Sequence, residues 1–133
     1  MTILDSLFAE RRNSDRVRLV AAEMLLKNDA GQYSTKIGLE MDEAKSKNQT
    51  ALYNGFIRIL VPAKSPSLED MARRLISYGG VIEKSLALDL ILNNEFRSLE
   101  DNIRSLLDER TNGASLARKA RSTLERLGFQ VDT

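Results

Sequence analysis

The sequence contains no cysteine and no histidine among its 133 residues. These absences exclude cysteine nucleophiles, histidine bases and every zinc site that needs either residue. The groups left for acid–base chemistry are carboxylates, lysine and tyrosine, and no pair of them is tied by the sequence to a recognisable pocket. We therefore expect a protein that is not an enzyme and that uses no metal and no cofactor.

Long apolar runs are also absent. No stretch approaches the roughly 18 apolar residues that suggest a membrane span, and the N-terminus lacks the basic-then-apolar order of a signal peptide. Charge of one sign is lacking too, because 20 basic residues oppose 19 acidic ones and leave a net charge of +1. We expect a cytoplasmic protein without a membrane partner, whose overall charge does not demand a polyanionic ligand.

The composition is that of a folded chain. Hydrophobic residues make up 42% and charged residues 29%, with 7 glycines and 2 prolines. A chain of this length can bury a core without disulfides or metal. The sequence predicts one domain over residues 1–133.

Residues 1–30 predict a pair of helices. Thr2 has Asp5 at the spacing of a capping box, and Ser14 offers a second N-cap before an apolar stripe of helical period. The pattern that follows predicts strands instead. Tyr33, Thr35, Ile37, Leu39 and Met41 alternate with more polar residues, as in a half-buried strand.

Residues 31–61 are accordingly expected to form strands. The Asn54–Gly55 pair is a strong two-residue hairpin signal, and the apolar run 56–61 predicts a strand buried on both faces. Residues 62–133 predict the order helix, strand, strand, helix, helix. The helix over 67–78 would end at Gly79–Gly80, where at least one glycine should adopt a positive φ.

Residues 81–92 fit two short strands, over 81–84 and 87–92, although leucine and alanine also favour a helix. From residue 94 the helical period returns, and two antiparallel helices are expected before and after Gly113. The fold class predicted is α/β, with mixed α+β as the alternative. A small sheet would be flanked by helices.

The strand 56–61, the helix ending in Gly79–Gly80 and the apolar segment 81–91 together resemble a BRCT-like domain over roughly residues 55–127. The resemblance implies a BRCT-like core with a parallel sheet. Three features depart from that family: Pro62-Ala63-Lys64-Ser65 replaces its small turn, the last helix has no tryptophan, and a fourth strand is hard to find. Phosphopeptide binding is therefore not implied.

The small size, helical N-terminus and BRCT-like middle also resemble the minor packaging and assembly proteins of cystoviruses, the double-stranded RNA bacteriophages. That resemblance implies a virion-associated homodimer that works with viral RNA and the polymerase complex.

Two clusters are candidate binding sites. Arg118, Lys119, Arg121 and Arg126 lie off the apolar stripe of the last helix and are candidates for contacting nucleic acid. The alternative is that acidic residues of the preceding helix neutralise them. Lys64, Ser65 and Ser67 are a candidate anion site at a helix N-terminus, for which the alternative is a simple N-cap.

These patterns favour a non-enzymatic structural or assembly factor that binds protein partners, with RNA as a further candidate partner, as in viral genome packaging or polymerase-complex assembly. Two alternatives remain. One is a nucleic-acid-binding regulator that uses the basic C-terminal helix, and the other is a small adaptor or chaperone with an exposed apolar patch.

Overall fold

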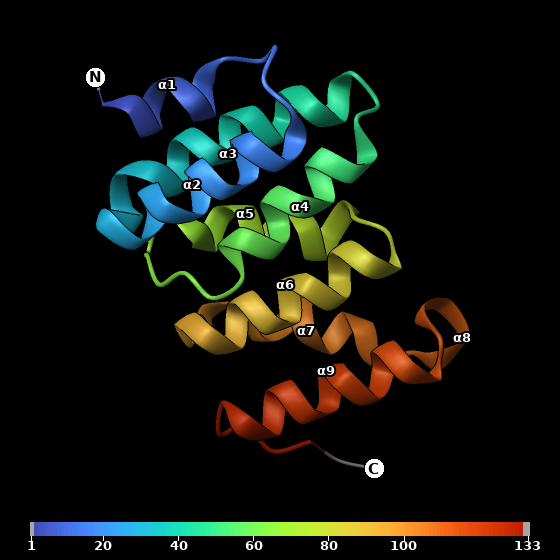
Figure 1. The fold of residues 1–133 in the computed structure, drawn as a ribbon. Coiled ribbons are helices and arrows are strands. Elements are labelled where there is room, and N and C mark those ends of the chain that lie inside the picture. Colours follow the sequence, from blue (N-terminus) through green and yellow to red (C-terminus); the bar gives the residue numbers. More distant parts are fainter. Residues whose placement is uncertain (1, 132–133) are drawn as a thin grey trace. The chain divides into compact units, whose positions relative to one another are not determined.

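The computed structural model describes residues 2–131, and every element of secondary structure in that range is a helix (Figure 1). The predicted α/β fold is therefore wrong, and so is the alternative with mixed α+β structure. No strand forms over 31–61 or over 81–92, so the sheet of a BRCT-like core is absent from the described residues.

The chain divides into two compact units, with the boundary between Ser67 and Leu68. The single domain expected from the length stays a prediction. The first unit holds α1 (Ile3–Ala9), α2 (Asp15–Asn28), α3 (Ala30–Ser46) and α4 (Thr50–Leu60). The second holds α5 (Leu68–Tyr78), α6 (Val81–Asn94), α7 (Glu100–Arg104), α8 (Glu109–Asn112) and α9 (Ala114–Arg126), with short 3₁₀ segments at Arg97–Leu99 and Ser105–Leu107.

The N-terminal helical pair is confirmed. Thr2 caps α1 in a reciprocal capping box with Asp5, and the Ser14 side chain accepts a hydrogen bond from the Val17 amide at the start of α2. Phe8 of α1 is buried and meets Phe56 of α4 edge to face, with ring centroids 6.1 Å apart. The first unit therefore has an aromatic contact that links its first helix to its last.

Helix α3 replaces the predicted strand at 33–41. Tyr33, Ile37 and Met41 are buried, whereas Leu39 between them is 65% exposed. Buried side chains four residues apart are typical of a helix. The apolar residues alternate along the sequence, but the buried side chains do not alternate in the structure. Asp29 caps the helix by accepting a hydrogen bond from the Gln32 amide.

Helix α4 replaces the predicted hairpin and strand. Its buried positions Leu52, Phe56 and Leu60 follow each other every four residues, and Pro62 comes shortly after its end. Gly55 lies inside the helix, where a Cβ atom would approach Leu19 Cδ1 to 2.7 Å. The glycine therefore allows close packing between α2 and α4 and does not form a turn.

Helix α5 is confirmed, and α6 replaces the two short strands. The glycine pair separates the two helices, but neither glycine has a positive φ, so that prediction is wrong. Among the described residues, the glycines with a positive φ are Gly113 and Gly128. Gly79 is required for another reason. A Cβ atom there would lie 2.5 Å from the Leu75 carbonyl oxygen and 2.6 Å from Glu83 Cβ, so the corner between the helices has no room for a side chain.

The C-terminal part contains one long helix where two were expected. Helix α9 matches the prediction, but the expected partner helix is divided into α7, α8 and the two 3₁₀ segments. Glu95 ends α6 in the left-handed conformation, and Asp108 starts α8 by accepting a hydrogen bond from the Arg110 amide. Gly113, with φ 86°, forms the break between α8 and α9.

Candidate functional site

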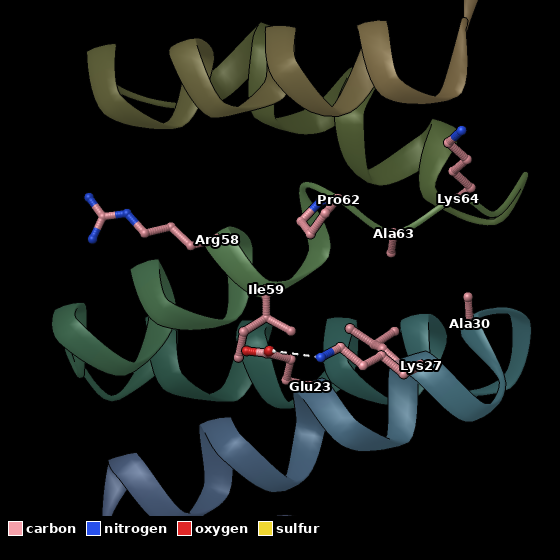
Figure 2. A pocket seen from close by; sticks show the side chains of 9 residues that line it. Glu23, Lys27, Ala30, Arg58, Ile59, Pro62, Ala63 and Lys64 are labelled. Carbon is pink, nitrogen blue, oxygen red and sulfur yellow. Dashed lines mark ion pairs between the residues drawn. The ribbon is translucent and has the colours of Figure 1, made fainter.

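The first unit carries an open groove of about 580 Å³ between α2, the start of α3 and the end of α4 (Figure 2). Five of its nine lining residues are apolar: Leu26, Ala30, Ile59, Pro62 and Ala63. The other four are charged: Glu23, Lys27, Arg58 and Lys64. Its volume falls in the range of ligand pockets, roughly 300–1,000 Å³.

The local sequence explains how the groove forms. Asp29 ends α2 and caps α3, so the chain reverses there and places Ala30 close to the last turn of α2. On the opposite wall, Pro62 follows the end of α4 and cannot continue the hydrogen-bond pattern of a helix. The chain then leaves α4 as a loop, and Ala63 and Lys64 of that loop complete the wall.

The charged residues around the groove carry a net positive charge. Lys27 pairs with Glu23 one helical turn away, at 3.4 Å. Arg58 and Lys64 are exposed, and within residues 2–131 neither has an acidic partner. Three cations and one carboxylate thus surround an apolar floor, which leaves two positive charges uncompensated.

An exposed apolar stripe on α2 lies beside the groove. Val17, Val20 and Met24 are 39%, 52% and 48% exposed. Helical spacing places Val20 three residues before Glu23, and Met24 three residues before Lys27, so the stripe borders the charged wall of the groove. Neither feature was predicted from the sequence. The sequence carries no signal that separates these three residues from the buried residues of α2, such as Ala21 and Leu25.

The candidate anion site does not present three free groups together. Ser65 is buried, and its hydroxyl lies 2.8 Å from that of Ser67, which is 2.7 Å from the hydroxyl of Ser34 on α3. These bonds hold residues 65–67 against α3. Lys64 instead lines the groove.

The candidate nucleic-acid residues on α9 differ from one another. Lys119 is engaged by α6, because its Nζ donates to Asp89 at 2.9 Å and to Ser85 at 2.8 Å. Arg118 and Arg126 are exposed and Arg121 is half-buried, and none of these three forms an ion pair within the described residues.

Two of the acidic residues expected to neutralise α9 pair with arginines of their own segment instead. Glu100 pairs with Arg104 at 2.7 Å, and Glu95 pairs with Arg97 at 3.2 Å. The carboxylate that pairs with α9 belongs instead to Asp89 of α6.

The structure offers neither a metal centre nor a membrane span in the range that it describes. Among residues 2–131, no group of three or more carboxylates is placed to hold a metal ion. No helix in the same range combines the length and apolarity needed to cross a membrane.

Comparison with known proteins finds no matching family model, no matching curated protein and no matching solved structure.

Proposed function

We propose that this protein is a non-catalytic binding module, and that a segment of a protein partner docks in the groove between α2 and α4. The observation that carries the proposal is the open groove of about 580 Å³ with an apolar floor. Such concave apolar surfaces with a few charged groups at the rim are typical of binding sites. A structural or assembly role, as the sequence predicts, is consistent with a module of this kind.

The neighbouring stripe favours a polypeptide over a compact small molecule. A small ligand would occupy the groove and leave Val17, Val20 and Met24 in water. A protein segment that continues past the Glu23–Lys27 wall would cover these side chains as well. Because these side chains are already about half buried, covering each of them would contribute roughly 0.5–1.5 kcal/mol before the costs of association are subtracted.

The groups that line the groove also favour binding over catalysis. Its one carboxylate, Glu23, is paired with Lys27. No hydroxyl or thiol lines the groove. The lining therefore supplies contact area and charge.

A second candidate function is nucleic-acid binding by α9, as the sequence predicts. Arg118, Arg121 and Arg126 support it because they have no acidic partner among the described residues. Lys119 contributes less, since Asp89 already neutralises it. Homodimer formation, the cytoplasmic location and the cystovirus resemblance stay predictions.

The docking proposal is tested by selecting peptides from a random phage-displayed library on the wild-type protein. The selected peptides are then measured by fluorescence anisotropy against Ala63→Phe, which adds a bulky side chain to the groove without changing its charge. Leu39→Ala is the control, because it alters an exposed apolar residue of α3 outside the groove.

We expect Ala63→Phe to weaken peptide binding roughly tenfold or more, because its ring occupies space that the peptide needs. Leu39→Ala should leave binding unchanged. Circular dichroism and thermal melting verify that each variant is folded. The proposal is wrong if the library yields no binder, or if the selected peptides bind folded Ala63→Phe as tightly as the wild type.

A further inference from the structure

We propose that the groove selects an acidic amphipathic segment of the partner, in which apolar side chains are flanked by aspartate or glutamate. This inference rests on the proposed docking function and adds the chemistry of the ligand. It is carried by the arrangement of the unpaired cations around the apolar floor.

The two unpaired cations lie on either side of an apolar surface. Arg58 belongs to the last turn of α4 and Lys64 to the loop beyond it, with Pro62 and Ala63 between them (Figure 2). In this view the Arg58 side chain extends to the left and the Lys64 side chain extends upward at the right, with Pro62 and Ala63 between them. A segment lying along Pro62 and Ala63 would therefore meet a positive charge at each end.

The opposite wall adds no competing negative charge. Glu23 is the single acid of the groove, and Lys27 is held at 3.4 Å from it. A carboxylate of the ligand that approaches this wall meets a neutral pair, and one that approaches Arg58 or Lys64 meets a free cation. Electrostatic complementarity of this kind selects the partner and speeds encounter more than it raises affinity.

The apolar floor distinguishes an acidic peptide from a nucleic acid. Phosphate contacts require cations and hydrogen-bond donors, and single-stranded bases also need aromatic platforms. The groove has no aromatic lining residue, and five of its nine lining residues are aliphatic or proline. Such a surface fits the leucine, isoleucine or methionine side chains of an amphipathic segment.

The test reverses the two groove charges on the protein and repeats the selection from the same peptide library. Peptides are selected in parallel on the wild type and on the double variant Arg58→Glu/Lys64→Glu, at low salt. A second double variant, Arg12→Glu/Arg110→Glu, reverses two exposed charges that do not line the groove and serves as the control.

We expect wild-type binders to be enriched in acidic residues and binders of Arg58→Glu/Lys64→Glu to be enriched in basic ones. The wild-type peptides should bind that variant roughly ten- to a hundredfold more weakly, because two attractions become two repulsions. Their affinity for the wild type should also fall as salt rises, since exposed charges are screened. The control variant should keep wild-type affinity.

Each contrary result has a distinct meaning. If both selections give peptides without a charge bias, the charge inference is wrong, while blockage by Ala63→Phe would still support docking. If no peptide is selected at all, the docking function itself fails. If dodecanoate, an apolar anion, binds the groove and displaces every selected peptide at equal or higher affinity, the site belongs to a small amphiphile and the inference is overturned.

Discussion

Replacing Glu40 by Gln should destabilise the first unit more than any other exchange of a carboxylate for an amide in that unit. Arg18 on α2 is 4% exposed, and its Nη2 donates to Glu40 Oε1 at 2.7 Å. Its Nε donates to the Phe8 carbonyl at 3.0 Å, and its guanidinium carbon lies 5.7 Å from the centre of the Phe56 ring. Glu40 is thus the carboxylate that neutralises a buried cation.

Breaking a buried ion pair by removing one partner costs about 3–5 kcal/mol, because the remaining charge stays buried without compensation. The Glu40 side chain is 14% exposed and also binds Arg11 at 2.9 Å, so water reaches part of the cluster. We therefore expect the lower end of this range, about 3 kcal/mol, for Glu40→Gln.

The free energy of unfolding is measured by urea denaturation with circular dichroism. Glu43→Gln on the same helix is the matched control, because its side chain is 35% exposed and pairs with Lys47 on the surface. That control should cost less than about 1 kcal/mol. A loss below about 1 kcal/mol for Glu40→Gln would refute this prediction, since it would place the Arg18 charge in contact with water.

Three further predictions concern other parts of the chain. Hydrogen bonds from Thr2 and Tyr33 lower the pKa of Asp5 to about 2. The stabilisation from this carboxylate should be present above its ordinary pKa near 3.8 and be lost as pH falls towards 2, and carbon-detected NMR titration of the Asp5 carboxyl should show the low midpoint. Gly79→Ala should destabilise by roughly 1–3 kcal/mol in urea unfolding. Gly31→Ala, whose Cβ would meet no atom closer than 3.6 Å, should not. If α9 binds nucleic acid, replacing Arg118 and Arg126 by Gln should reduce the slope of log K against log salt by roughly 0.7–0.9 for each phosphate that is no longer neutralised, and an unchanged slope in a filter-binding assay would remove the candidate.

The sequence predicted helices correctly where capping residues and an amphipathic stripe agreed. Thr2 with Asp5 identified α1, and Ser14 identified α2. The helix predicted over 67–78 matches α5. These signals are local, so a single sequence contains them in full.

The strand predictions failed because the decisive information lay in packing. The positions of Tyr33, Ile37 and Met41 fit both a period of two and a period of four residues. The exposure of Thr35 and Leu39, which lie between them, shows that the period is four. Asn54–Gly55 has the composition of a hairpin turn, but Gly55 accommodates Leu19 of another helix. Contacts between distant residues override local preferences of this kind.

The candidate site was harder to predict than the helices. The groove combines residues from α2, α3, α4 and the loop after α4, and no spacing in the sequence links Glu23 or Leu26 to Arg58 or Ile59. The sequence groups Lys64 with Ser65 and Ser67 as a candidate anion site. In the structure Lys64 lines the groove, whereas the two serines do not.

The most direct test of docking is NMR mapping of a selected acidic peptide on the ¹⁵N-labelled protein. We predict that the largest amide shift changes fall on residues of the groove, including Lys27, Ile59 and Ala63, and extend to Val20 and Met24 on α2. Shift changes confined to α9, or spread without reference to the groove, would contradict docking at this site.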